Sequence, residues 1–171
     1  MITTSVLICM TVFSIDMRNA DVICDNAHII EEMSKTYDLD PSLIIAVGRI
    51  ESAWTPTARS GSNACGVMQV LPKYSKKHGD KGRNLTCDEL KHPETGIRVG
   101  SKILSYWLHK YAKGNETTAL CGYNAGFRCK GENKNEQGLK YAKAVLKYRK
   151  YFKRKMRIQK RKYKNEMFAN H

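Results

Sequence analysis

The feature that most constrains the fold is a helix signal between residues 40 and 51. Asp40 and Pro41 form a typical helix start, because an aspartate side chain caps free N–H groups and proline fits the first turn. The apolar positions that follow recur at spacings of three and four residues: Leu43, Ile44, Val47 and Ile50. This period predicts a rigid, buried helix that ends at Glu51.

Glu51 would stand at the point where this helix gives way to a loop rich in Ser, Thr, Pro and Gly between residues 56 and 63. A carboxyl group held against apolar neighbours is costly to ionise, so its pKa should rise. It could then stay protonated near neutral pH, as a general acid must. The alternative is an ordinary solvated glutamate at a helix end.

The rest of the chain also favours a mainly α fold. Apolar residues at helical spacing predict helices at about residues 26–36, 95–113 and 116–122, and a further helix from about residue 137. Strand-like alternation never persists for more than a few residues, so we expect at most a small hairpin in the loops. A chain of 171 residues suits one domain with a single core.

The N-terminal 20 residues are predicted to lie outside this domain. Residues 6–15 are mostly apolar and match the length of a signal-peptide core, although no Lys or Arg precedes them. A cleaved signal, a retained anchor and an ordinary buried or disordered N-terminus remain alternatives. We therefore place the domain at residues 21–150 and a basic tail at residues 151–171.

Cleavage of that segment would remove Cys9 and leave five cysteines, at least one of them unpaired. The pairing cannot be chosen from the sequence, although disulfides in an oxidising compartment are the simplest interpretation. No cysteines stand at metal-finger spacing and no histidines form a two-ligand motif, so we predict neither a metal site nor a cofactor.

The positive charge is concentrated at the C-terminus. The chain has a net charge of +14, and residues 138–171 hold thirteen Lys or Arg and one acid. Such a run is most often a solvated helix face or a disordered tail. It could also bind anionic polymers or membrane surfaces of the cell envelope, or nucleic acid through phosphates and interleaved aromatic residues.

Four blocks of sequence resemble the soluble lytic transglycosylases, lysozyme-like enzymes that cleave peptidoglycan. They are Glu51-Ser52 with Pro56, Ala58 and Ser60; residues 66–70 followed by Pro72; residues 93–104; and Tyr123-Asn124-Ala125-Gly126. The resemblance covers about residues 24–150 and implies a lysozyme-like fold. It also implies peptidoglycan glycan strands as the substrate.

The resemblance implies a reaction with one carboxyl group. Glycosidases commonly use two, yet Asp80, Asp88, Glu89 and Glu94 are better explained as helix-start or solvated residues. In the family, one glutamate protonates the bond between N-acetylmuramic acid and N-acetylglucosamine, then deprotonates the C6 hydroxyl to give a 1,6-anhydro end. The position that often holds a second glutamate in relatives corresponds here to Gln137.

The remaining motif residues are candidate substrate-binding groups. Ser60 could bond to the glutamate or the sugar N-acetyl group, or make a local turn. Gln69 offers an amide to sugar, with a plain surface role as the alternative. Tyr123 offers a stacking ring and a hydroxyl, and Asn124 an amide; both could instead serve packing alone.

The function predicted from these motifs is a lytic transglycosylase that works as a monomer in the periplasm or outside the cell. A wall-turnover enzyme, a secretion or conjugation accessory and a bacteriophage particle component are all compatible settings. The alternatives are a hydrolytic lysozyme on the same fold, a non-catalytic wall-binding module, and a basic nucleic-acid-binding protein.

Overall fold

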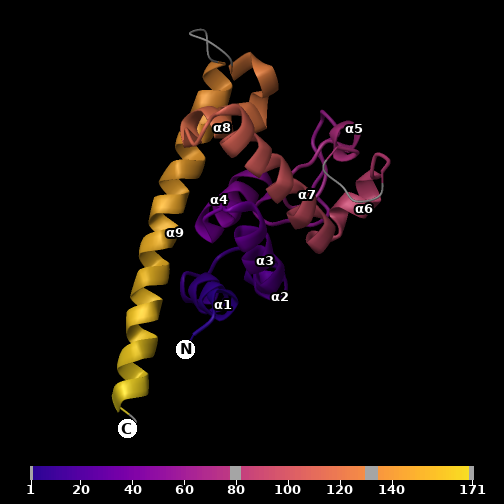
Figure 1. The fold of residues 1–171 in the computed structure, drawn as a ribbon. Coiled ribbons are helices and arrows are strands. Elements are labelled where there is room, and N and C mark those ends of the chain that lie inside the picture. Colours follow the sequence, from indigo (N-terminus) through magenta and orange to yellow (C-terminus); the bar gives the residue numbers. More distant parts are fainter. Residues whose placement is uncertain (1, 78–81, 130–134, 170–171) are drawn as a thin grey trace.

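The computed structural model describes residues 2–77, 82–129 and 135–169, and in these segments the protein is almost entirely helical (Figure 1). Nine α-helices, one π-helical turn and one 3-10 turn follow one another in the described part of the chain. They are α1 (Thr4–Ser14), α2 (Ala20–Asp25), α3 (Ala27–Tyr37), α4 (Pro41–Ser52), α5 (Pro72–Ser75), α6 (Cys87–Lys91), α7 (Pro93–Ser105), η1 (Tyr106–Tyr111), α8 (Glu116–Ala125), η2 (Gly126–Cys129) and α9 (Glu136–Ala169).

Helix α4 is the buried centre of the fold. Seven consecutive residues, 42–48, are shielded from solvent, and α3 and α9 pack against the helix. The predicted start is confirmed: the Asp40 carboxylate accepts a hydrogen bond from the Ser42 amide at 2.9 Å, and Pro41 occupies the first turn. The apolar period therefore predicted this element correctly, except that Ile50, expected on the buried face, is exposed.

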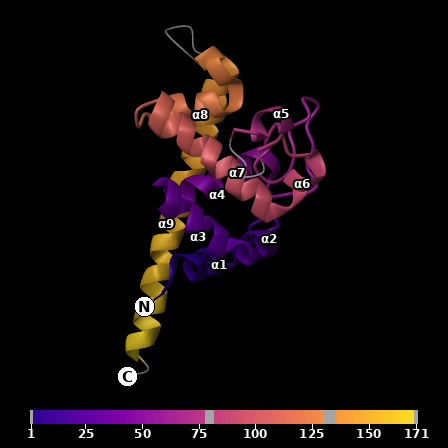
Figure 2. The same cartoon turned by 45° about the vertical axis from the view of Figure 1, so that its right-hand side comes forward.

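Helix α9 is the longest element and lies along one side of the molecule (Figures 1 and 2). Its N-terminal half packs against α8, α4 and α1, burying Ala142, Val145 and Phe152. Its last turns project past the other helices. The helix runs unbroken from Glu136 to Ala169, and the predicted boundary at residue 150 falls inside its packed part, because Phe152 is fully buried and Met156 packs against the core.

The expectation that residues 1–20 lie outside the fold does not match the structure. Helix α1 packs against α2, α3 and α9, with Ile8 and Val12 fully buried. Cys9 is bonded to Cys24, and Glu31 accepts a hydrogen bond from the Ser5 amide at 2.8 Å. An apolar helix of this length loses its contact with water most readily by packing on the core. Cleavage of the segment stays a prediction.

The ends of two other helices differ slightly from those predicted from the sequence. The helix predicted for residues 95–113 ends at Ser105 and continues as the π-helical turn η1. Helix α8 extends past residue 122, so Tyr123 and Asn124 are helical. In place of a hairpin, the described loops contain only isolated antiparallel bridges, which pair Cys65 with Arg59 and with Val70.

A charged network joins α9 to the start of α4. Arg149 contacts the Asp40 carboxylate at 3.1 Å and also pairs with Glu116, at the start of α8. Lys153 reaches Asp40 at 2.6 Å. Because these bonds favour the carboxylate, the pKa of Asp40 lies well below its usual range despite partial burial. One side of α9 thus holds the first turns of two other helices.

Replacing Asp40 with Asn should lower the unfolding free energy by about 1–3 kcal/mol at pH 7, because Lys153 loses its anion and Arg149 keeps only Glu116, while the helix cap is kept. A depressed carboxyl pKa stabilises the fold above the unfolded-state value of about 4 and does so progressively less below it. Urea titrations should therefore show the two proteins converging in acid. Asp38→Asn, at an exposed helix end, is the control and should be nearly neutral.

Candidate active site

Glu51 lies in the last turn of α4, at the end of the buried stretch. The helix stops because Ala53 and Trp54 both take the left-handed conformation, with φ of 51° and 62°. The Trp54 indole then folds back under the helix, fully buried, and donates to the Ile45 carbonyl at 3.1 Å. A side chain at Gly48 would collide with this ring at 2.6 Å. The Trp54 side chain therefore fixes the backbone of the helix turn that carries Glu51.

The segment 66–70 forms a second wall beside α4. The Ser52 hydroxyl donates to the Val67 carbonyl at 2.8 Å, which joins the end of α4 to this segment. Met68 is fully buried against Gly100 of α7, where a larger residue would not fit. Its carbonyl accepts a hydrogen bond at 2.9 Å from Tyr123 of α8. Met68 therefore packs inward and fixes the segment between α7 and α8.

Two tyrosines, one from α8 and one from α9, lie near Glu51. The Tyr141 hydroxyl donates to a carboxylate oxygen of Glu51 at 2.6 Å. Burial raises the pKa of Glu51 to about 7, and the bond from Tyr141 opposes that rise. Burial, with the nearby Glu51 charge, also raises the pKa of the Tyr123 and Tyr141 hydroxyls well above its ordinary value. Both phenols therefore stay neutral donors.

The other predicted site residues contact local partners or solvent. The Ser60 oxygen accepts from the Ala64 amide at 3.0 Å, within its own loop. The Gln69 amide nitrogen donates to the carbonyls of Gly66 and Ala58 at 3.0 and 3.2 Å, bracing the segment 66–70. Asn124 is exposed near the end of α8. The fold brings Tyr123 toward Glu51, while Ser60 and Gln69 order the loop.

The acidic residues considered as second carboxylates are held in surface ion pairs. Asp88 contacts Lys91 at 3.0 Å, Glu89 contacts Arg83 at 2.8 Å and Glu94 contacts Arg98 at 2.9 Å. Asp80 lies outside the described residues. Glu51 is thus the acidic group that stands out in the described part of the chain, because its carboxyl is both buried and hydrogen-bonded to a neutral donor.

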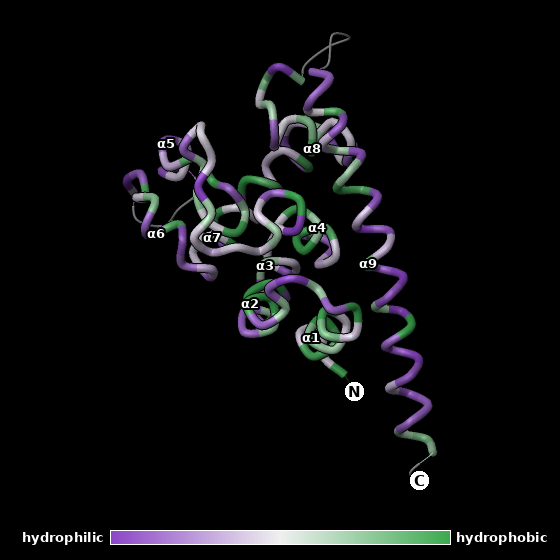
Figure 3. Tube along the Cα trace, turned by 180° about the vertical axis from the view of Figure 1, so that it is seen from behind, coloured by the Kyte–Doolittle hydropathy of each residue, from purple (hydrophilic) through white to green (hydrophobic). Residues whose placement is uncertain are grey.

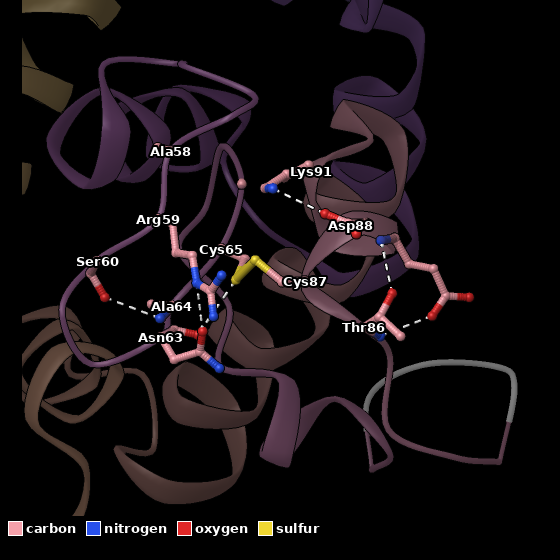
Figure 4. The surroundings of a disulfide bond; sticks show 12 residues. Ala58, Arg59, Ser60, Asn63, Ala64, Cys65, Thr86, Cys87, Asp88 and Lys91 are labelled. Atoms are coloured by element: carbon pink, nitrogen blue, oxygen red, sulfur yellow. Dashed lines mark hydrogen bonds and ion pairs between the residues drawn. A yellow bond between two sulfur atoms is a disulfide. The ribbon is translucent and has the colours of Figure 1, made fainter.

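In the uncleaved chain all six cysteines form disulfides, and the unpaired thiol expected after cleavage of residues 1–20 stays a prediction. That expectation rests on the loss of Cys9, which pairs with Cys24 in the uncleaved chain. Cys65, in the same loop as Ser60, is bonded to Cys87 at the start of α6, as Figure 4 shows. Cys121 joins α8 to the end of η2 through Cys129. Disulfides therefore border both motif segments.

Tyr141 was not among the residues predicted for the site. The sequence did show Tyr141, Val145, Tyr148 and Phe152 on one helical face, and that face packs on the domain. A hydroxyl on the packed face of a helix needs a partner, which was the available signal. Only the contact between α9 and α4 identifies that partner as Glu51, ninety residues away in the chain.

Residues 28–146 match the family described as Transglycosylase SLT domain. The match covers most of the chain, and the helices and the Glu51 centre described above lie largely within it. The chain belongs to the SLT family, a group of lysozyme-like proteins. The family predicted from the four sequence blocks is confirmed, and so is the mainly α, lysozyme-like fold class.

Curated relatives include a membrane-bound lytic murein transglycosylase C of Glaesserella parasuis, 31% identical over 108 residues. An endo-type membrane-bound lytic murein transglycosylase A of an Enterobacter strain is 35% identical over 100 residues, and a soluble lytic murein transglycosylase of Salmonella typhimurium is 33% identical over 93. These matches cover 57%, 56% and 52% of this chain but only 30%, 49% and 14% of the relatives.

Solved structures with the same fold include an inactive mutant of the lytic transglycosylase Slt from Pseudomonas aeruginosa. It superposes with a TM-score of 0.67 at 22% identity, over 90% of this chain and 30% of the larger protein. The 70 kDa soluble lytic transglycosylase of Escherichia coli gives 0.64 at 23%, over 89% and 30%. At these identities the likeness concerns the fold.

Replacing Tyr141 with Phe should raise the pKa of Glu51 above about 7, because the lost hydrogen bond stabilises the ionised carboxylate. Carboxyl carbon NMR titration of Glu51 measures this directly. Tyr148→Phe, on the same helix but bonded to the Met17 sulfur, is the control and should leave the value unchanged. A Glu51 pKa that is unaltered in the Tyr141 variant would contradict this role.

Replacing both Cys65 and Cys87 with Ser should lower the unfolding free energy by about 3 kcal/mol, because the closed loop spans 22 residues. Hydrogen exchange should also quicken at the Gly66 and Val70 amides, whose bonds order the loop beside Glu51. The matched control removes Cys9 and Cys24, which should destabilise the protein without changing exchange in this loop. Equal loop protection in both variants would argue against a local clamp.

Proposed function

We propose that this protein is a lytic transglycosylase that cleaves the β-1,4 bond between N-acetylmuramic acid and N-acetylglucosamine in peptidoglycan. The observation that carries the proposal is the buried Glu51 carboxyl, whose pKa is raised and which is hydrogen-bonded to Tyr141. Burial raises the pKa of the Glu51 carboxyl to about 7, so the protonated and the ionised forms are both populated near neutral pH. This is the condition for a general acid that must also act as a base.

In the first step, protonated Glu51 donates its proton to the oxygen that bridges the two sugars. The bond from C1 of N-acetylmuramic acid to that oxygen breaks, and its electron pair stays on the departing oxygen. Positive charge develops at C1, and the sugar's own N-acetyl group assists in stabilising it. Tyr141, bonded to Glu51, supports the carboxylate as it forms.

In the second step, the Glu51 carboxylate removes the proton from the C6 hydroxyl of the same sugar. The C6 oxygen bonds to C1 and closes a 1,6-anhydro ring, so no water is consumed and Glu51 returns to its protonated form. A single carboxyl group completes the cycle. The absence of a second buried carboxyl beside Glu51 in the described residues supports this route over a two-carboxylate hydrolysis.

We propose that the four motif residues bind the substrate through the polar groups they offer. Tyr123 presents a neutral hydroxyl and ring next to the acid, and we assign it contact with the reacting sugar. Asn124, exposed on the next position, offers an amide to the glycan strand. Gln69 and Ser60 hold the facing loop and offer their remaining polar groups to the sugar N-acetyl and hydroxyl groups.

The substrate places the enzyme in the cell envelope, in the periplasm or outside the cell, or on a phage particle that penetrates the wall. Disulfides for all six cysteines support an oxidising compartment. No described helix is long and apolar enough to span a bilayer. We propose that the enzyme acts as a monomer on glycan strands, with secretion or conjugation machinery as a compatible partner.

The test is zymography on purified peptidoglycan with Glu51→Gln. Loss of the acid should reduce clearing by about 100- to 10,000-fold. Glu94→Gln, a surface carboxylate in an ion pair with Arg98, is the matched control and should clear normally. Clearing by the Glu51 variant at the wild-type rate would refute the assignment. Retained wall binding without any wild-type clearing would indicate the binding module instead.

The product distinguishes transglycosylation from hydrolysis on the same fold. Mass analysis of digested wall should show muropeptides lighter by one water than hydrolysed ends, because the C6 oxygen replaces water at C1. Reducing ends would support the hydrolytic lysozyme.

Activity should fall as pH rises through about 7, where Glu51 loses its proton. Wild-type stability should fall as pH rises from the unfolded-state pKa of about 4 to about 7 and then level off, while that of Glu51→Gln should not, because ionising a buried carboxyl destabilises the folded state.

A further inference from the structure

Seven basic residues form one line along the solvent side of α9. They recur at alternating spacings of four and three residues and are all exposed: Lys143, Lys147, Lys150, Arg154, Arg157, Arg161 and Lys164. A repeat of 3.5 residues keeps side chains on one side of a helix. At 1.5 Å per residue the line is about 31 Å long. We call these seven residues the basic ridge. Figure 3, which shows the molecule from behind, colours most of α9 as hydrophilic.

The basic ridge is not neutralised by the protein. Three acids near α9 pair with other bases: Asp40 with Arg149 and Lys153, Glu116 with Arg149, and Glu136 with Lys140. Glu166 is two residues past Lys164 and so lies about 200° around the helix from it. Among the residues described, no carboxylate lies within ion-pair distance of a ridge side chain. Shallow hollows connect its first five members, one lined by Lys143, Lys147 and Lys150, the next by Lys147, Lys150, Arg154 and Arg157.

Packing does not account for the basic ridge. The side of α9 that holds the fold together carries Val145 and Phe152, and it faces away from the ridge. Like charges three and four residues apart destabilise a helix. The ridge repeats this unfavourable spacing over six turns, including turns that project beyond the domain (Figure 1). An anionic surface outside the protein would convert the repulsion into attraction.

We propose that the basic ridge docks the protein on the surface of an anionic phospholipid membrane. A straight line of charges touches a plane along its whole length, and lipid headgroups can diffuse laterally to meet each base. A flexible polyanion would lose conformational entropy to follow the same line. The line continues four residues past Lys164 to Phe168, whose side chain is 80% exposed, beside Met167 at 50%. Apolar side chains at the ridge end suit the headgroup boundary.

Docking would also orient the catalytic centre. Tyr141, which contacts Glu51, precedes Lys143 by two residues and so lies about 200° around the helix from it. With the basic ridge on the membrane, α4 and Glu51 would lie on the far side of α9, facing away from the lipid. This orientation rests on the proposed function. The membrane docking does not.

The experiment is co-sedimentation of the full chain with vesicles of phosphatidylcholine alone or with added phosphatidylglycerol. We expect binding to the anionic vesicles only, weakening at least tenfold as salt rises from low to physiological concentration. The ridge variant Lys147→Gln/Arg154→Gln/Arg161→Gln should bind at least tenfold more weakly than wild type. The matched control Lys155→Gln/Lys160→Gln/Lys162→Gln removes the same charge from other sides of α9 and should bind within about threefold of wild type.

Equal weakening by the two triple variants would refute the basic ridge and leave only net charge. Binding to neutral vesicles, or to none, would refute membrane docking. Tighter, ridge-dependent binding to duplex DNA than to anionic vesicles would replace it with nucleic-acid binding. Cleavage of soluble glycan fragments should be the same for all variants, so failure of docking is distinguishable from failure of the catalytic proposal. Circular dichroism should show equal helix content in both triple variants.

Discussion

The contact between Tyr141 and Glu51 is the interaction on which the site depends. It joins the end of the central helix α4 to the long helix α9 at 2.6 Å, inside a region where burial raises the carboxyl pKa to about 7. Burial favours the protonated acid, and the phenol partly stabilises the carboxylate. These opposing effects suit the role proposed for Glu51, which gives up a proton and takes one back.

The scaffold makes that contact possible by fixing both helices from several directions. Trp54 fixes the end of α4 through a hydrogen bond to its backbone. Asp40 joins the start of α4 to α9 through ion pairs with Arg149 and Lys153. The same helix α9 therefore stabilises the start of α4 through ions and its end through a neutral hydrogen bond. Its other side remains free for the basic ridge, so one element serves both the catalytic centre and the proposed membrane contact.

Much of the fold follows from local patterns. The cap at Asp40, the apolar period up to Ile50 and the wider period of α9 predicted helices close to those observed, because these signals depend on neighbours a few residues away. The sequence was less informative about residues 1–20. Their apolar character suits export as well as burial, and only packing on α3 and α9, with the bridge from Cys9 to Cys24, places them in this fold.

For the site, the sequence by itself determined that a glutamate ends a buried helix and that Tyr123 belongs to a recognisable motif. The tertiary structure decided which groups meet that glutamate. Tyr141 is ninety residues from Glu51, and Gln69 turns its amide toward backbone carbonyls of its own loop. Helical period reports which face of a helix is buried, whereas the partner across the interface depends on how the helices are oriented against each other.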